Sequence, residues 1–589
     1  MSWTRRGAAA LLAVGFALAS GAQEPAALFF NHPTPLTVFN GVEGLLVGSN
    51  GCRIAGAAEA GQLGSDVDGA GDFDGDGRPD MLLAAPLFGI GGNFRAGRVY
   101  LVWGTNSFLP EQAVNLLGAG VLDGAAAEDR AGSAVAGGGD FNDDGLADFA
   151  AGAPNADEGT RTNCGAVALV FGTTNRFTSL SFSALNGSNG ILLTAQSTGA
   201  LAGSSVAWTG DWNGDGRAEL AVGAPAAYGN GRVYVLYGNP AAPHPIALDA
   251  LNGTNGFILT GAVGGGGAGT TVANIGDFDG DGLDDLAIGA PAEPDIFSAG
   301  RVYVVFGGAD RPALLSLASL DGTNGFRLDG SGFFSGIGQA IAGADVNGDG
   351  RSDLLVGARG LSSVFVLYGS SNRLPVRSTT ALNGTNGFVL ISPVAGGDFG
   401  ACVARAGRMN ADAFEDFLVG ALNEPPSGLP GAGRLYAVMG APSFASTTSV
   451  ALLNGTNGFY FAGQQGDAEF GNAAASLGDL NDDGCDEIIA GEWLLDAGSP
   501  ALTNAGAAYL VSPAGIAGYV LHRPVFSTTL LTNGAPELVW TAQPGAEYTV
   551  LGAESPLGPW QNMVTTTGGV WSATGLPTRA VYRVDARRL

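Results

Sequence analysis

Short apolar runs separated by Gly, Asn and Asp recur along most of this chain of 589 residues. The unit is clearest in the middle of the sequence, where the runs cover residues 257–260, 269–275, 285–289 and 301–306. Each run is too short for a helix, and such runs between turn residues are typical of strands. The pattern therefore predicts a meander of four antiparallel strands in each unit.

An acidic segment marks each unit and gives the period. Residues 71–86 read GDFDGDGRPDMLLAAP, and versions of this segment recur about 68 residues apart, with the first ligand position at 72, 140, 211, 277, 345, 408 and 479. Four strands per repeat at such a period indicate a propeller, which usually has about four to eight blades. We predict an all-β fold with a seven-bladed β-propeller over residues 50–520. An open solenoid, the alternative, would need capping ends.

The two ends of the repeat array complement each other. Residues 50–55 look like the strand that precedes each acidic segment, whereas the seventh unit ends after residues 507–511 without such a strand. The N-terminal strand can therefore complete the last blade. Closure of this kind removes an exposed sheet edge, which would otherwise invite aggregation.

The flanking segments differ from the repeats. Residues 1–22 have the positive start, apolar run and small-residue cleavage site of a secretory signal, and the apolar run is shorter than the roughly 20 residues of a membrane span. Residues 23–49 form a mixed segment with possible strands at 27–30 and 36–39. Residues 521–589 alternate apolar and polar positions between turn clusters, which predicts a small β-sandwich-like domain.

The acidic segments carry the candidate chemistry. Asp72, Asp74 and Asp76 alternate with small residues, and Asp80 stands eight positions after the first Asp. Ca²⁺ takes about six to eight oxygen ligands, and a tight loop supplies them from positions 1, 3, 5 and 9 and from the carbonyl at position 7, here Arg78. Without a cation these carboxylates repel, by roughly 4 kcal/mol per pair at 4 Å. The spacing therefore predicts a bound cation.

The alternative is that Asp, Asn and Gly only make turns. Repetition argues against it, because a turn alone does not require a further acid eight residues after the first. The expected ligands of the six intact loops are Asp72, Asp74, Asp76, Arg78, Asp80, Asp140, Asn142, Asp144, Leu146, Asp148, Asp211, Asn213, Asp215, Arg217, Glu219, Asp277, Asp279, Asp281, Leu283, Asp285, Asp345, Asn347, Asp349, Arg351, Asp353, Asp479, Asn481, Asp483, Cys485 and Glu487.

One further loop is damaged. Its first position is Arg408, followed by Asn410, Asp412 and Asp416. A guanidinium there offers positive charge where an ion needs an oxygen, so we expect this sixth repeat to fold without metal. The sequence thus predicts about six Ca²⁺ sites.

The composition agrees with an acidic, metal-binding β protein. The net charge is −28 and there are 99 glycines, and six bound Ca²⁺ would bring the formal charge to about −16. Nucleic acid is an unsuitable partner because binding its backbone needs a positive face. Cys52, Cys164, Cys402 and Cys485 are too few for a disulfide scaffold, and their spacing assigns no pairs.

The repeats resemble a known family. GAP elements follow the acidic loops at residues 152–154, 223–225 and 289–291, and FG precedes them at 399–400 and 470–471. These elements resemble FG-GAP repeats, those of the integrin α-subunit β-propeller, over about residues 50–511. The resemblance implies a seven-bladed propeller with Ca²⁺ in loops between the first and second strands of blades. It also implies that the metal loops lie on the face away from the ligand.

The preferred function is a secreted or surface-exposed, calcium-binding adhesion module for a protein or glycan, acting as a monomer and not as an enzyme. Trp103, Trp212 and Tyr237 are candidate contacts if they reach the face opposite the metals, although strand packing is the favoured interpretation of these aromatics. The alternative is an extracellular hydrolase or lyase acting on polysaccharide or lipid. No catalytic residues and no other cofactor are predicted, because the metal loops account for the paired carboxylates.

Overall fold

The computed structural model describes residues 27–31, 36–39, 42–45, 51–105, 111–293, 299–309, 311–332, 335–410, 412–463, 465–481, 484–496 and 502–512, and six strands between 527 and 588. The predicted signal at residues 1–22 and the predicted ligand Asp483 lie outside the described residues. The chain divides into two compact units, Met1–Val511 and Ser512–Leu589. No described helix is long and apolar enough to cross a membrane.

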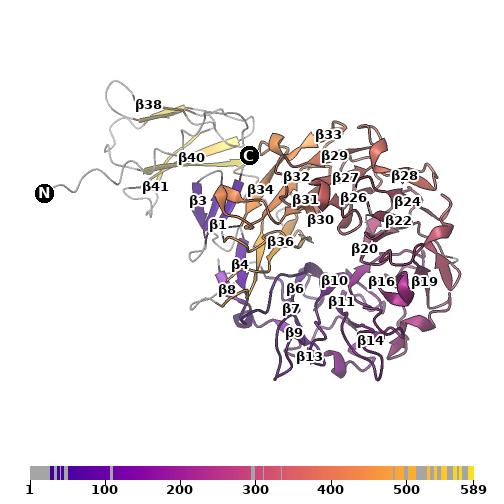
Figure 1. The fold of residues 1–589 in the computed structure, drawn as a ribbon. Helices are drawn as coiled ribbons and strands as arrows, with labels where there is room; N and C mark the ends of the chain where they lie inside the picture. Colours follow the sequence, from indigo (N-terminus) through magenta and orange to yellow (C-terminus); the bar gives the residue numbers. More distant parts are fainter. Residues whose placement is uncertain are drawn as a thin grey trace. The chain divides into compact units, whose positions relative to one another are not determined.

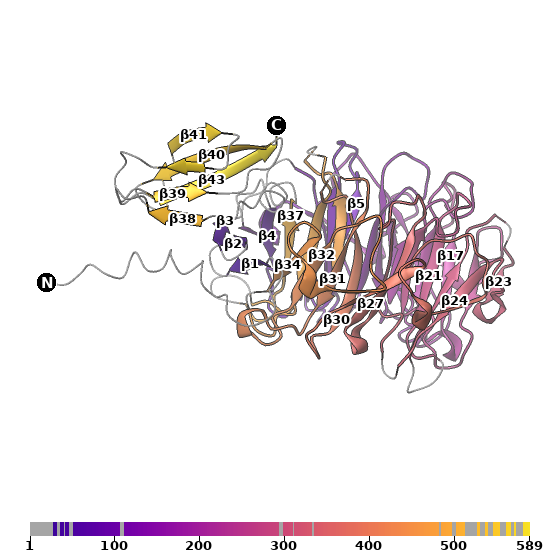
Figure 2. The ribbon, with the colours of Figure 1, turned by 90° about the horizontal axis from the view of Figure 1, so that it is seen from above.

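Seven sheets stand around a ring in the first unit (Figure 1). Blade four shows the pattern, with β20 (Thr271–Gly276), β21 (Asp285–Ala290), β22 (Arg301–Val305) and β24 (Gly325–Asp329) paired antiparallel in that order. The runs predicted at 269–275, 285–289 and 301–306 match β20, β21 and β22 within one or two residues at the ends, whereas the run at 257–260 is β19 (Gly256–Thr260) and belongs to the preceding blade three. Figure 2 shows strands such as β21 and β24 running across the thickness of the ring.

The other blades repeat this order of strands. Blade one has β5 (Val67–Gly71), β6 (Asp80–Ala85), β7 (Arg98–Val102) and β9 (Gly120–Asp123); blade two β10 (Ala134–Gly139), β11 (Asp148–Ala153), β12 (Ala166–Val170) and β14 (Gly190–Thr194); blade three β15 (Ser205–Trp208), β16 (Leu220–Ala224), β17 (Arg232–Leu236) and β19 (Gly256–Thr260); blade five β25 (Ile341–Ala344), β26 (Asp353–Ala358), β27 (Ser363–Leu367) and β29 (Gly387–Ile391); blade six β30 (Phe399–Gly407), β31 (Asp416–Ala421), β32 (Arg434–Val438) and β34 (Gly458–Ala462); blade seven β35 (Ala474–Gly478), β36 (Glu487–Glu492), β37 (Ala507–Val511) and β4 (Gly51–Ala55).

Closure of the ring by the two ends of the repeat array is confirmed. Strand β4 pairs antiparallel with β37, with Ile54 opposite Ala508, so the N-terminal strand completes blade seven. The first strands of the blades also contact one another in an unbroken circle, from β5 through β10, β15, β20, β25, β30 and β35 back to β5.

Neighbouring sheets bury their apolar faces against each other. Between blades three and four, Val233 and Phe257 pack with Leu286 and Tyr303, all at most 1% exposed. The second strands are buried on both faces, as the all-buried residues of β21 show. This double burial explains why the second strands read as continuous apolar runs.

Six of the seven sheets gain a short fifth strand that the sequence analysis did not predict. In blade three, β23 (Leu314–Ser316) pairs parallel with β19. Two or three residues are too few to give a recognisable pattern. The corresponding strands are β8 (Glu111–Ala113), β13 (Leu180–Ser181), β18 (Ile246–Ala247), β28 (Val376–Ser378) and β33 (Thr447–Ser449).

In blade six this outer place is taken by the N-terminal segment. Strand β1 (Ala27–Asn31) pairs parallel with β34, and β2 (Leu36–Phe39) and β3 (Val42–Leu45) follow. The strands expected at 27–30 and 36–39 are therefore confirmed, whereas β3 was not predicted.

Short 3₁₀ turns and a second set of strands complete the described structure. The turns are η2 (Val114–Leu116), η3 (Phe182–Ala184), η4 (Ala227–Gly229), η5 (Leu248–Ala250), η6 (Leu317–Ser319), η7 (Arg359–Leu361), η8 (Thr379–Ala381), η9 (Pro426–Gly428) and η10 (Val450–Leu452). The second unit has two three-stranded antiparallel sheets, formed by β38 (Ser527–Leu530), β39 (Pro536–Val539) and β42 (Val570–Ser572) and by β41 (Gln561–Thr566), β40 (Ala546–Ala553) and β43 (Val581–Arg588).

Candidate metal centres

Every acidic loop connects the first and second strands of its blade, at one end of the ring. In blade four the first carboxylate, on Asp277, accepts main-chain hydrogen bonds from Gly280 at 2.6 Å, Asp281 at 3.0 Å and Gly282 at 2.8 Å. Gly280 and Gly282 have φ of 80° and 93°, which glycine adopts without a steric penalty. The alternation of Asp and Gly therefore wraps the chain around the first carboxylate.

The ninth-position carboxylate is buried beneath the loop. In blade four, Asp285 accepts hydrogen bonds from the main-chain N–H of Phe278 and of Gly307, both at 2.9 Å. Gly307 follows Phe306, just after the third strand, β22. Asp285 therefore connects the acidic loop to the end of that strand. The same double contact is made by Asp80, Asp148, Asp353 and Asp416.

Two loops carry Glu at the ninth position. Glu219 accepts from the main-chain N–H of Trp212 at 2.7 Å and from Asn213 Nδ2 at 2.9 Å. Glu487 repeats this arrangement with Leu480 and Asn481. The longer side chain thus contacts the third-position residue of its own loop.

Burial raises the pKa of the ninth-position carboxylate. Desolvation, followed by the charges of neighbouring acids, raises the pKa of Asp285 and of Asp353 to about 8. The same causes raise the pKa of Asp80 to about 7 and of Glu219 to about 8. A cation bound in the loop would favour the charged form.

Two loops gather three carboxylates around one point. Oxygens of Asp72, Asp74 and Asp76 lie within 4.8 Å of one another, and so do oxygens of Asp277, Asp279 and Asp285. The loops at Asp140, Asp211 and Asp345 have Asn at the third position and so offer one fewer carboxylate.

The donor set of these two loops fits a hard cation. Asp72 Oδ1 and Asp279 Oδ1 are buried and accept no hydrogen bond from the described residues. A buried carboxylate oxygen without a donor is costly unless a cation satisfies it. Oxygen ligands alone are what Ca²⁺ prefers.

The sequence analysis missed two arginines that contact these loops. Arg176, on the connection after the third strand of blade two, pairs with Asp74 and, at 3.0 Å, with Asp76 of blade one. Arg373 of blade five lies 2.8 Å from Asp279 of blade four. The only sequence signal is a shared Asn-Arg pair after the third strand. These guanidinium groups supply positive charge to the same carboxylates.

Neighbouring loops are also joined through their main chains. The eighth residue of one loop donates its N–H to the first-position carbonyl of the preceding loop, as in Ala147 to Asp72 at 3.1 Å and Ser352 to Asp277 at 3.0 Å. Glu415 and Asp345 form the same bond, also at 3.1 Å. The loops therefore contribute directly to the contact between blades.

The damaged sixth loop keeps the structural contacts of its ninth-position acid although its first acid is absent. Asp416 keeps both main-chain hydrogen bonds, and burial raises its pKa to about 7, although Arg408 replaces the first acid. The ninth acid thus also makes structural contacts that do not depend on the first acid, so its presence alone does not distinguish a metal loop from a turn. The first-position acid is the more specific signal for metal.

The three aromatics proposed for the opposite face do not reach it. Trp212 is fully buried at the second position of its metal loop and stacks on Phe257, with centroids 5.0 Å apart. Tyr237 lies 6.0 Å from the same ring, and Trp103 lies 6.3 Å from Phe73. These positions face the neighbouring blade next to the loops, so the interpretation as strand packing is confirmed.

The cysteines and the described histidine add no further chemistry. None of the four cysteines, all of which the structure describes, forms a disulfide, and burial raises the pKa of Cys52 and of Cys402 to about 12. His244 Nδ1 accepts a hydrogen bond from the main chain of Leu192 at 3.3 Å.

Comparison with known proteins agrees with this architecture. The FG-GAP repeat family matches residues 63–102, 131–170, 202–236, 268–305 and 337–367, which cover the first three strands of blades one to five. The chain is a seven-bladed β-propeller that carries FG-GAP repeats.

Phospholipases and integrins are among its relatives. The chain is 34% identical to mouse phosphatidylinositol-glycan-specific phospholipase D over 173 residues, which are 29% of this chain and 20% of that protein. It is 35% identical to human integrin alpha-IIb over 180 residues, 28% of this chain and 15% of the integrin. It is 33% identical to Xenopus laevis integrin alpha-4 over 155 residues, 25% of this chain and 13% of the integrin. The matched segments thus span at most a fifth of these relatives.

Proposed function

We propose that the propeller is an extracellular binding module stabilised by Ca²⁺ in its blade loops. The observation that carries the metal assignment is the pair of three-carboxylate clusters, each with a buried oxygen that accepts no hydrogen bond from the described residues. In blade four, Asp277, Asp279, Asp281 and Asp285 and the carbonyl of Leu283 would hold the ion. The ion would neutralise the carboxylates and fix the loop between two strands.

The remaining intact loops are proposed as further Ca²⁺ sites, giving about six in all. The loops of blades one and four, with four acids each, should bind most tightly, since affinity rises with the number of charged ligands. Binding calorimetry against Ca²⁺, starting from chelator-treated protein, tests this proposal. Fewer than two bound ions per chain at millimolar Ca²⁺ would refute it.

Secretion follows from the predicted signal and suits the metal, because extracellular modules can use sites with Kd of about 10⁻⁴ to 10⁻³ M. We propose that the protein acts as a monomer, and that it binds a protein or glycan ligand through the face opposite the loops. The resemblance to integrin α propellers supports this function. A pull-down from extracellular fractions, with Ca²⁺ and with chelator, tests it, and no retained partner in Ca²⁺ would count against it.

The second candidate is a hydrolase acting on lipid or polysaccharide. The identity to a phosphatidylinositol-glycan-specific phospholipase D supports it, but the matched segment is only 20% of that protein. We prefer the binding module, since the described acids in the loops hold main-chain N–H groups. An activity screen on glycolipid and polysaccharide substrates tests the choice, and turnover abolished by substitution outside the metal loops would favour the enzyme.

A further inference from the structure

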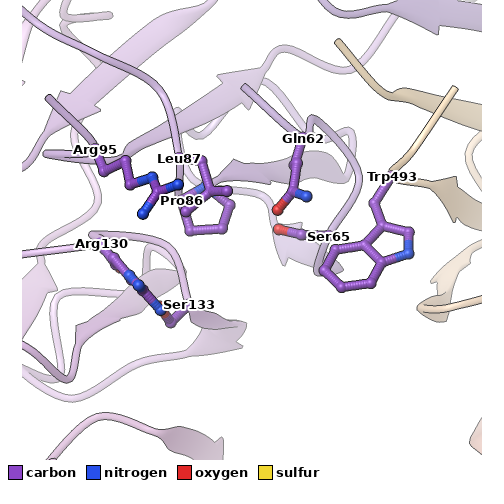
Figure 3. Close-up of a pocket in the computed structure, with 8 residues that line it drawn as sticks. All are labelled: Gln62, Ser65, Pro86, Leu87, Arg95, Arg130, Ser133 and Trp493. Atoms are coloured by element: carbon purple, nitrogen blue, oxygen red, sulfur yellow. The ribbon is translucent and has the colours of Figure 1, made fainter. Parts of the chain in front are cut away.

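A pocket of about 440 Å³ lies where blades seven, one and two meet (Figure 3). Gln62 and Ser65 line it just before β5, and the far end of β5 leads into the first metal loop. The pocket is therefore at the end of the strands opposite the metal loops. Arg95 and Arg130 line one side and Trp493 the other.

The two arginines are poorly neutralised. Arg95 Nη1 lies 3.9 Å and Arg130 Nη2 lies 4.0 Å from the same oxygen, Oε2 of Glu128. Neither arginine has another ion pair with the described residues, and Arg130 Nε is buried without a hydrogen-bond partner among them. The pocket thus concentrates positive charge on a protein whose net charge is −28.

Both arginines also occupy unusual backbone positions. Arg95 has φ of 50° and Arg130 has φ of 56°. The main-chain N–H of Arg130 donates to the carbonyl of Arg95 at 3.2 Å. Between blades two and three, the main-chain N–H of Leu201 donates to the carbonyl of Asn163, also at 3.2 Å. The two arginines are therefore a facing pair at a position that recurs between blades.

At the position of Arg95, other blades carry less strained residues. Asn163 and Asn504, equivalents of Arg95, have φ of 48° and 49°, and Asn adopts this left-handed conformation more readily than most residues. At the position of Arg130, Gly267 and Gly336 avoid the steric penalty, whereas Gln62, Leu201 and Glu469 have φ of 55–57° as Arg130 does. Strained backbone at a pocket is a pointer to function. The side chain of Arg95 is thus present at a conformational cost that Asn and Gly would lower.

The opposite side of the pocket offers an aromatic surface and neutral hydrogen-bonding groups. The indole of Trp493 is oriented by a hydrogen bond from its Nε1 to Glu469 Oε2 at 3.0 Å. The side-chain amide of Gln62 makes no hydrogen bond with the described residues, and the Ser65 hydroxyl makes only a long one of 3.5 Å to Ala84. These groups are available to a ligand.

We propose that this pocket binds an acidic sugar, a uronate unit of a polysaccharide. The carboxylate would receive charge-assisted hydrogen bonds from Arg95 and Arg130. The apolar C–H face of the sugar ring would pack on Trp493, and the ring hydroxyls would bond to Gln62 and Ser65. The volume lies within the range of small-molecule sites, about 300–1,000 Å³.

The combination favours a sugar over an acidic peptide. A peptide carboxylate would use the two arginines but has no flat apolar face to set against the indole. A pyranose ring with a carboxylate presents both features within one residue. The inference rests on the proposed binding function, to which it adds the ligand class.

The test is a titration of the full-length, Ca²⁺-loaded protein with oligogalacturonate and oligoglucuronate, followed by tryptophan fluorescence and calorimetry. Neutral oligosaccharides of the same length, sulfated oligosaccharides and a poly-aspartate peptide are the comparison ligands. We expect binding of at least one uronate series, with affinity that falls as salt rises. No binding of the neutral series is expected.

The variants use residues that other blades already accept. Arg95→Asn and Arg130→Gly should each weaken uronate binding about tenfold, and together should abolish it, while folding is preserved because both changes relieve the backbone. Leu201→Gly, at the equivalent position of the next junction, is the matched control and should bind as the wild type does. Trp493→Phe should reduce the fluorescence response and the affinity.

The outcomes separate this inference from the general function. Uronate binding unchanged in the Arg95→Asn, Arg130→Gly double variant would overturn the site. Tighter binding of poly-aspartate or of sulfated sugars would overturn the ligand class. A folded protein that captures an extracellular partner but binds no uronate would refute this inference alone, whereas one that binds neither would refute the proposed function as well.

Discussion

Removing the first carboxylate of an intact loop gives the sharpest test of the metal assignment. Asp277→Ala removes one ligand and three main-chain hydrogen bonds, from Gly280, Asp281 and Gly282. Asp412→Ala, in the damaged sixth loop, removes bonds from the main-chain N–H of Phe414 at 2.8 Å and from Asn410 Nδ2 at 2.9 Å. The two variants therefore form a matched pair, since we expect only the first to lose a bound ion.

The difference between the variants can be estimated. Each lost hydrogen bond costs about 1 kcal/mol net, and relief of repulsion from Asp279 and Asp281 offsets part of the loss in Asp277→Ala. Without metal the two variants should thus be destabilised by similar amounts, about 1–3 kcal/mol. At Ca²⁺ one hundred times the site Kd, binding adds about 2.7 kcal/mol to the wild type. Asp277→Ala should lose this contribution and Asp412→Ala should keep it.

The assay is differential scanning calorimetry of wild type and both variants, in millimolar Ca²⁺ and in chelator. The rise in Tm on adding Ca²⁺ should be smaller for Asp277→Ala than for wild type by about 5 °C or less, because a long chain gains little Tm per kcal/mol. Asp412→Ala should show the wild-type rise. If Ca²⁺ raised the Tm of both variants equally, the loop of blade four would hold no ion through Asp277.

Three further predictions concern Arg176, the first strand of blade one (β5) and the strand that closes the ring (β4). Arg176→Gln should raise the Ca²⁺ affinity of the first loop several-fold, because it removes a cation from Asp74. Terbium emission sensitised by Trp103, which lies under the Arg176 guanidinium, would report the change in affinity. Unchanged affinity would mean that Arg176 does not compete with the ion. Burial raises the pKa of Asp68 to about 7 from 3.8, so its contribution to stability is complete below pH 4 and is lost as the pH rises through about 7. Asp68→Asn should therefore gain Tm relative to wild type between pH 5 and 8, and a constant difference would contradict this. Ile54→Ala, in the closing strand and fully buried, should cost about 2–5 kcal/mol in denaturant unfolding, and a loss below 1 kcal/mol would mean that this strand is not needed to close the ring.

The repeating ring could be predicted from the sequence because its signals are local. The acid at position 1, the glycines after it and the buried second strand all fall within about 20 consecutive residues. The complete pattern recurs six times, and a seventh copy lacks the first acid and the glycines. The strand at Gly51–Ala55 was also predictable, since the last blade otherwise lacked its fourth strand.

The contacts between blades could not be predicted in this way. Arg176 meets Asp74 across 102 positions, and Arg373 meets Asp279 across 94, so no short pattern joins them. The structural role of Asp416 was hidden as well, because its partner Gly440 lies 24 residues further on. The facing of Arg95 and Arg130 likewise depends on the meeting of two blades.

The bonds from loop to loop explain how one blade can lose its ion while the ring stays intact. The main-chain N–H of Glu415 in the sixth loop donates to the carbonyl of Asp345 at 3.1 Å. The main-chain N–H of Asp486 in the seventh loop donates to the carbonyl of Arg408 at 3.2 Å. Because these links run between peptide groups, replacement of the first acid by arginine leaves them in place. The ring can therefore tolerate drift in its ion-binding side chains, one blade at a time, provided that the backbone path of each loop is maintained.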